Sequence, residues 1–160
     1  MNQRERFLFD LNGYLVLEDV LTAEEIRACN EAIDRNPEHV VEKPSLVEGT
    51  GALSGSGVRG DIVDVLTWPQ PWCRPFRDLL AHPRVVPYLV ELLRDGFRLD
   101  HLYGILMNKG SEGLQLHHDG TMDDLLSFYQ FHAGRMRCGL TVVSWNLTDC
   151  GPGDGGFMCI

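Results

Sequence analysis

The spacing of apolar residues changes near residue 97 of the 160-residue chain, and this change limits the possible folds. Before it, apolar residues recur at helical intervals, as at Ile26, Cys29 and Ile33. After it, short apolar runs are separated by turns such as residues 149–155, which are rich in glycine, proline and aspartate. Helices followed by strands indicate a helical layer packed on an antiparallel sandwich or barrel. We therefore predict one α+β domain over residues 1–160, mostly helical over 1–97 and mainly β over 98–160.

Local signals place the elements of the helical layer. Residues 7–20 are expected to form a short entry segment and a strand, with a turn at Gly13. Thr22 and Glu25 have capping-box spacing, which predicts a helix that begins there and ends before Pro37. Further helices are expected over residues 76–81 and 83–96.

Residues 40–60 are expected to form a loop that is rich in glycine and serine. Its last part, Gly55-Ser56-Gly57-Val58-Arg59-Gly60, matches the letters of a dinucleotide-binding fingerprint. That fingerprint needs a strand before it and a helix after it, whereas a Gly/Ser-rich stretch precedes it here. We interpret the match as a flexible loop and not as a nucleotide site.

Three strands are predicted in the second part of the chain, over residues 98–108, 137–147 and 156–160. Residues 121–132 between them form either a short helix or a structured insert, because their apolar residues follow no clear period.

Composition argues against several classes of partner. The formal net charge is −9 and no basic run interrupts the acidity, which disfavours nucleic acid or an anionic membrane as the main partner. No signal peptide and no apolar run of the roughly 20 residues needed to span a membrane is visible. The five cysteines are scattered and form no CxxC pair, which is typical of reduced thiols in a cytoplasmic protein.

The segment with the most chemical information is Leu114-Gln115-Leu116-His117-His118-Asp119-Gly120-Thr121. In a strand, His117 and Asp119 would project from one face and His118 from the other. One imidazole and one carboxylate are two of the three ligands of the 2-His-1-carboxylate triad that binds Fe(II). Taken alone, this spacing is more often a polar strand end, here before a turn at Gly120, than a metal site.

The whole chain resembles the phytanoyl-CoA dioxygenase-like family of Fe(II)- and 2-oxoglutarate-dependent oxygenases. Three blocks carry the resemblance in order. They are Phe9-Asp10-Leu11-Asn12-Gly13-Tyr14-Leu15-Val16-Leu17 with Leu21-Thr22-Ala23-Glu24-Glu25-Ile26, then His117-His118-Asp119, then Trp145-Asn146-Leu147-Thr148-Asp149 with Asp154-Gly155-Gly156-Phe157-Met158-Cys159-Ile160.

The resemblance implies a double-stranded β-helix, a cupin-like jelly roll with iron bound between its two sheets. It implies that His117 and Asp119 are metal ligands and that His118 lies near the cosubstrate. The strand around Tyr103, Ile105 and Met107 resembles one that lines the 2-oxoglutarate pocket, and Ser144 or Trp145 would lie on the facing strand. The activity implied is hydroxylation of a small organic substrate, coupled to decarboxylation of 2-oxoglutarate to succinate.

The chain departs from this family pattern in its last part. The family's third ligand, a histidine, and the arginine that pairs with 2-oxoglutarate have no counterpart at the expected place, because His132, Arg135 and Arg137 come too early. The chain also stops on an apolar strand. We therefore expect an incomplete jelly roll, from a truncated sequence or from a short protein that pairs with another chain, and weak iron binding by two protein ligands.

Two other functions remain open. One is a non-catalytic jelly-roll module for binding or interaction, in which the His117–Asp119 spacing is incidental. The other is a cupin-like metal enzyme that does not use 2-oxoglutarate. No basic cluster points to the phosphates of coenzyme A, so an acyl-CoA substrate is not assumed, and the sequence sets no oligomeric state.

Overall fold

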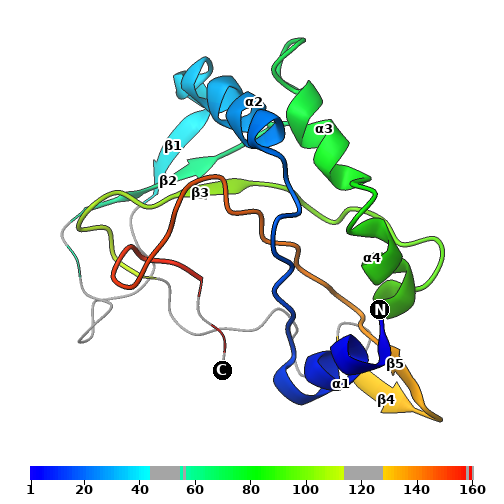
Figure 1. The fold of residues 1–160 in the computed structure, drawn as a ribbon. Coiled ribbons are helices and arrows are strands. Elements are labelled where there is room, and N and C mark those ends of the chain that lie inside the picture. Colours follow the sequence, from blue (N-terminus) through cyan, green and yellow to red (C-terminus); the bar gives the residue numbers. More distant parts are fainter. Residues whose placement is uncertain (44–54, 56, 114–127, 158, 160) are drawn as a thin grey trace.

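The computed structural model describes residues 1–43, 55, 57–113, 128–157 and 159. Its helices are α1 (Gln3–Asn12), α2 (Ala23–Asp34), the 3-10 helix η1 (Pro37–His39), α3 (Arg74–Leu80) and α4 (Val86–Leu93). Its strands are β1 (Val40–Lys43), β2 (Arg59–Ile62), β3 (Gly104–Leu106), β4 (Gln130–His132) and β5 (Arg135–Arg137). They form an antiparallel sheet in the order β1-β2-β3 and a separate β4-β5 hairpin, with α2 and α3 on one side of the sheet (Figure 1).

Helix α2 begins where the sequence predicts. The Thr22 hydroxyl accepts a hydrogen bond from the Glu25 amide at 3.2 Å, and the Glu25 carboxylate accepts one from the Thr22 amide at 2.8 Å. These two bonds satisfy donors that a helix N-terminus otherwise leaves unpaired. The predicted helix over 76–81 is confirmed as α3. Helix α4 begins at Val86, three residues later than predicted, because residues 83–85 form a turn closed by the Val85 amide on the His82 carbonyl at 2.9 Å.

The start of the chain differs from the prediction. Residues 3–12 form helix α1, with a capping box between Asn2 and Glu5, and Gly13 ends it with a φ of 77°. Glycine tolerates this left-handed conformation at a helix C-terminus. The strand predicted after Gly13 is absent, because no described strand pairs with residues 14–20. The sequence did not predict α1, because none of its residues is buried and its apolar residues therefore form no clear stripe at helical spacing.

Residues 40–60 are not simply a loop, because β1 and the start of β2 lie in this stretch. Gly60 lets β2 lie close to the Val40 side chain of β1, since a Cβ at this position would be only 2.7 Å from Cγ1 of Val40. A glycine inside a strand often marks such a close approach. The rejected nucleotide fingerprint is followed by strand β2 and not by the helix it requires. Its Gly57 lies against the backbone of Gly110, to which the Gly57 amide donates a hydrogen bond at 2.8 Å.

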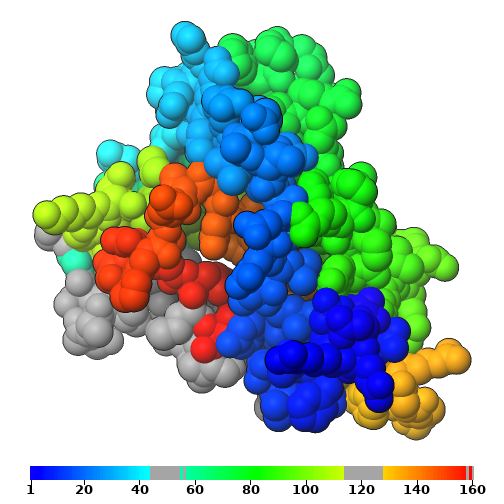
Figure 2. Space-filling model, in the orientation of Figure 1, coloured from blue at the N-terminus to red at the C-terminus, as the bar shows by residue number. Residues whose placement is uncertain are grey.

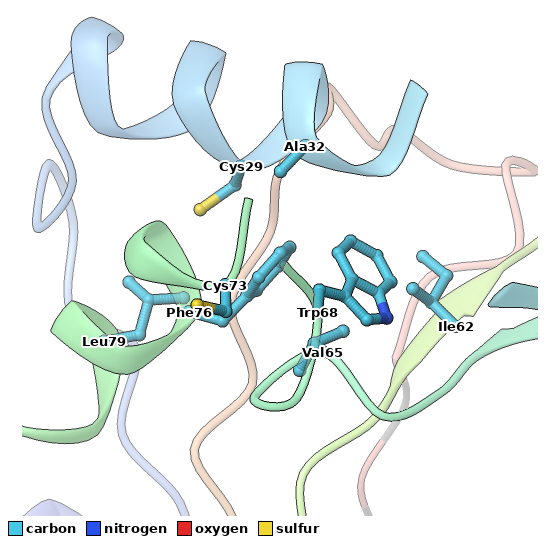
Figure 3. Close-up of a cluster of buried hydrophobic side chains, with 8 residues drawn as sticks. All are labelled: Cys29, Ala32, Ile62, Val65, Trp68, Cys73, Phe76 and Leu79. Carbon is cyan, nitrogen blue, oxygen red and sulfur yellow. The ribbon is translucent and has the colours of Figure 1, made fainter. Parts of the chain in front are cut away.

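The main hydrophobic core lies between α2, α3 and one face of the sheet (Figure 3). Trp68 is its largest buried residue, with its indole N–H donating to the Val63 carbonyl at 3.0 Å and its ring 5.4 Å from that of Phe76. The other buried members are Cys29, Ala32, Ile62, Val65, Cys73, Phe76 and Leu79. The core therefore joins the helical layer to the sheet through Ile62 of β2.

A second, smaller core cluster holds the hairpin. Its buried residues are Leu92 of α4, Met136 of β5 and Cys138, and the Cys138 amide donates to the Leu92 carbonyl at 2.9 Å. The hairpin turns at Ala133 and Gly134, with φ values of 51° and 74°. Two positive φ angles in a two-residue loop are typical of a type I′ turn, which suits the twist of paired strands.

The predicted strands of the second part form only in fragments. The strand predicted over 98–108 is reduced to the three residues of β3, and the one predicted over 137–147 keeps only Arg137, as the end of β5. Residues 156, 157 and 159 of the last predicted strand belong to no strand. A strand needs a partner backbone alongside it, and within the described residues β3 pairs only with β2. The turn over 149–155 is present, closed by the Asp154 amide on the Gly151 carbonyl at 3.1 Å.

The observed architecture agrees in part with the predicted fold. The helical layer and the antiparallel sheets are present, whereas the described strands form no closed barrel. The space-filling view is hollowed between the blue N-terminal segment and the orange and red C-terminal segment (Figure 2). No helix in the described part of the chain combines the length and apolar composition needed to cross a lipid bilayer.

Candidate functional site

The register of the β1-β2-β3 sheet separates its two faces. Residues opposite each other in antiparallel strands project to the same face. Val40, Ile62 and Gly104 are in register, and Ile62 belongs to the main core, so these residues lie on the face covered by helices. Gly104 permits close packing there, because a Cβ at this position would lie 2.9 Å from Cδ1 of Ile62.

The opposite face of the sheet carries charge. Val41, Asp61 and Ile105 are in register across the three strands, and Lys43 lies opposite Arg59. We call these five residues the charged face. Alternation along the strand places Tyr103 and Met107, each two residues from Ile105, on the same side. The residues predicted to line the 2-oxoglutarate pocket therefore lie on the same face of the sheet as Arg59 and Asp61.

Asp61 is the centre of the charged face. It is 3% exposed, and its Oδ2 lies 2.9 Å from Nζ of Lys43 while its Oδ1 lies 3.0 Å from Nε of Arg59. The Arg59 side chain is 13% exposed, and its Nη1 has no hydrogen-bond acceptor in the described part of the chain. A buried charged group is normally paired, and here two cations share the single carboxylate of Asp61.

Sequence reasoning missed this cluster. Arg59 and Asp61 stand two residues apart, which is the spacing of one strand face, but the surrounding glycines and serines favoured a loop. Lys43 could not be linked to them, because its approach depends on the pairing of β1 with β2. Strand pairing between distant residues leaves little local signal in a sequence.

Two of the predicted cosubstrate residues lie at the sheet's edge strand or beyond it. Tyr103 precedes β3, is 47% exposed, and stacks on the ring of His101 with centroids 5.4 Å apart. Met107 follows β3 and lies against the C-terminal turn, since a Cβ on Gly155 would be 3.6 Å from its Cε. Their roles in cosubstrate binding stay predictions.

Residues 141–148 alternate between half-buried and exposed side chains although they form no strand. Trp145 packs on the main core, and its ring meets that of His82 edge-on with centroids 5.5 Å apart. Ser144 is exposed, and its place in the alternation is opposite to that of Trp145. The described contacts therefore place Trp145 toward the helical layer and Ser144 away from it.

His82 is a further buried polar residue that the sequence did not single out. It is 6% exposed, and its Nε2 lies 3.5 Å from Oε1 of Glu25. Two hydrogen bonds from Thr22 lower the pKa of Glu25. The bond from the Thr22 amide has the larger effect and the bond from its hydroxyl the smaller one. His82 thus connects the start of α2 to Trp145 and joins the two layers of the domain.

The predicted metal ligands His117 and Asp119, together with His118, lie outside the described residues. Within the described residues, no group of three or more histidine, cysteine, aspartate or glutamate side chains is arranged to hold a metal ion. His132 is exposed on β4 opposite Arg135.

Comparison with known proteins gives one match. No curated protein and no solved structure matches the chain. The family description Phytanoyl-CoA dioxygenase (PhyH) matches residues 9–160, which include the His117–Asp119 segment, the charged face and the C-terminal segment. Members of this family are dioxygenases, generally dependent on Fe(II) and 2-oxoglutarate, and the family implies a cupin-like jelly roll. The chain therefore belongs to the phytanoyl-CoA dioxygenase family.

Proposed function

We propose that this protein is an Fe(II)- and 2-oxoglutarate-dependent dioxygenase that hydroxylates a small organic substrate. The observation that carries the proposal is the family match over residues 9–160, which includes a His-x-Asp pair at positions 117 and 119. An imidazole and a carboxylate two residues apart are the donor types that hold non-haem iron in oxygenases. Neither a nucleic acid nor a membrane surface is proposed as a partner, given the net charge of −9.

His117 and Asp119 would supply two ligands to the iron. When bound, the iron would supply the activation of O₂ that hydroxylation of an unactivated C–H bond requires. The protein's own contribution is to orient 2-oxoglutarate and substrate beside that centre and to limit the access of water. The third ligand is not assigned, because His132, the one histidine after Asp119 in the sequence, is exposed on the hairpin.

The cosubstrate pocket is proposed on the face of the sheet away from the helices. Tyr103 and Met107 support this, because alternation from Ile105 places them on that face. His118 is proposed beside them, from its place between the two ligands. Between the neighbours Ser144 and Trp145, the packing of Trp145 on the main core favours Ser144 as the residue on the pocket side.

A cytoplasmic location is part of the proposal. All five cysteines are free, and Cys29, Cys73 and Cys138 are buried among apolar residues. Burial is the main cause that raises the pKa of the Cys29 thiol to about 11, so this thiol stays protonated at neutral pH. Free, buried thiols support a reducing compartment.

Metal and cosubstrate binding can be tested by thermal unfolding. Mn(II), a redox-inert substitute for Fe(II), added together with 2-oxoglutarate should raise the melting temperature of the protein, because ligands that bind only the folded state stabilise it. His117→Ala should lose most of this increase. His132→Ala is the matched control, since His132 is exposed on the β4 strand of the hairpin.

The same measurement separates the two alternatives. A metal enzyme that does not use 2-oxoglutarate would respond to Mn(II) alone, with no further increase from the cosubstrate. A non-catalytic binding module would respond to neither. If His117→Ala responds as strongly as the parent protein, the assignment of this histidine is wrong.

A further inference from the structure

The charged face contains a donor group that the proposed iron site does not use. Arg59 and Asp61 stand on the side of β2 that points away from the main core, and Ile105 lies opposite Asp61. The proposed cosubstrate strand thus runs beside a nearly buried guanidinium group. An arginine here is not needed to pack the helical layer, because Ile62 serves that purpose from the other face.

The charges of this cluster do not cancel. Asp61 contributes one negative charge, whereas Arg59 and Lys43 contribute two positive charges, so the group has one positive charge in excess. Lys43 keeps 52% of its side chain exposed, but Arg59 keeps only 13%. Water therefore screens the charge of Lys43 well and the charge of Arg59 poorly. We assign the excess positive charge to the Arg59 guanidinium, where it can act on a nearby anion.

The hydrogen bonding of Arg59 is also incomplete. Its Nε is close to Asp61 Oδ1 at 3.0 Å but without good hydrogen-bond geometry, and its Nη2 reaches Asp61 Oδ2 only at 3.5 Å. Its Nη1 is buried and has no acceptor within the described residues. Guanidinium N–H groups form a planar fork that matches a carboxylate. Asp61 holds this fork from one side and leaves the buried Nη1 donor at the other edge unpaired within the described residues.

We propose that Arg59 binds the carboxylate of a small organic molecule at the proposed active site, with Asp61 as the residue that positions it. The inference rests on the proposed function and adds a substrate class to it, namely small carboxylic acids. The carboxylate belongs to the substrate to be hydroxylated, and binding of 2-oxoglutarate at Arg59 instead is an outcome of the test. One positive charge in excess suits a single carboxylate better than the several phosphates of coenzyme A.

The test is an NMR titration that observes the Nε–Hε signals of the arginine side chains. Propionate is the probe, propionamide is its neutral counterpart, and sodium chloride keeps the ionic strength constant. Propionate should shift the Arg59 signal until it saturates, and propionamide should not. Arg98, which is exposed, is the matched control and should not shift in a saturable way. Arg59→Lys identifies the signal, and Arg59→Gln should weaken propionate binding by at least roughly tenfold.

A second arm identifies the source of the carboxylate. The titration is repeated with saturating 2-oxoglutarate and Zn(II), which is diamagnetic. If propionate still shifts Arg59, the site serves the substrate, as proposed. If 2-oxoglutarate alone moves the signal and prevents the propionate shift, the site serves the cosubstrate and the proposed substrate class is wrong.

The proposal is overturned if neither carboxylate shifts Arg59, if the amide acts as strongly as the acid, or if Arg98 responds equally. The parent protein gives these results even if the variants fail to fold. Loss of the Mn(II) and 2-oxoglutarate response with an intact propionate shift would count against the proposed function and not against this site. The reverse pattern would count against this site alone.

Discussion

At the scale of single residues, side-chain contacts decide a question that the sequence leaves open. Ser144 and Trp145 are neighbours, so one residue of register determines which of them faces the helices. Trp145 meets His82 and packs on the main core, while Ser144 is exposed. The sequence could indicate that one of the two belongs to the pocket side, but only contacts with α2, α3 and their neighbours distinguish them.

Removing the Trp145 ring tests this orientation. Trp145→Ala should lower the free energy of unfolding by about 2–4 kcal/mol, since loss of a large aromatic side chain from a core costs about 3–5 kcal/mol and Trp145 is only partly buried. Asn146→Ala, at the exposed neighbouring position, should change it by less than about 0.5 kcal/mol. Urea unfolding followed by circular dichroism measures both. Equal effects of the two substitutions would show that the register assigned to this segment is wrong.

At the scale of elements, helices were easier to predict than strands. The α2 capping box is formed by Thr22 and Glu25, which are three residues apart in the sequence and need no distant partner. Strand β2 is different, because its sequence Arg-Gly-Asp-Ile has little strand propensity and is stabilised by β1 and β3 on either side. The charged face depends on the same pairing, which is why Lys43 and Arg59 could not be brought together from sequence.

The α2 capping box should make stability depend on pH. The hydrogen bonds from Thr22 lower the pKa of Glu25 below its ordinary value of 4.5. A carboxyl group with a lowered pKa in the folded state stabilises the protein above its unfolded pKa, and this stabilisation is lost as pH falls through the folded pKa. The free energy of unfolding of the parent protein should therefore decrease as the pH is lowered below about 4.5, and Glu25→Gln should reduce that decrease.

Glu24→Gln is the matched control for this measurement. Glu24 lies one position away in the first turn of α2, is exposed, and forms an ion pair with the exposed Arg27 at 3.3 Å. Thr22→Ala should cost about 1 kcal/mol at neutral pH, as expected for the loss of an N-cap. Urea unfolding at several pH values between 3 and 7 compares the variants. If Glu25→Gln and Glu24→Gln have the same pH profile, the capping box contributes nothing to acid stability.

At the scale of the whole molecule, the described contacts between the C-terminal segment and the helical layer are unevenly distributed along the segment. The Asn30 side-chain amide donates to the Leu147 carbonyl at 2.7 Å, Trp145 meets His82, and the Cys138 amide binds the Leu92 carbonyl. The order of blocks predicted the family and the helical layer, because both are properties of the sequence. It could not predict how the second layer closes. Closure depends on which strands pair with residues 98–108 and 137–147, and most of these residues have no strand partner within the described part of the chain.

Hydrogen exchange should reveal this uneven attachment. The Cys138 amide, bonded to Leu92 inside the smaller core cluster, should exchange slowly, as should the ladder amides of β2. The amides of residues 139–147 donate to no backbone carbonyl in the described part of the chain, so they should exchange much faster. Exchange resolved by NMR measures both groups in one sample. Equally slow exchange over 139–147 would mean that a further strand pairs with this segment. The side opposite Trp145, where Ser144 lies, would then be enclosed as a jelly-roll oxygenase requires.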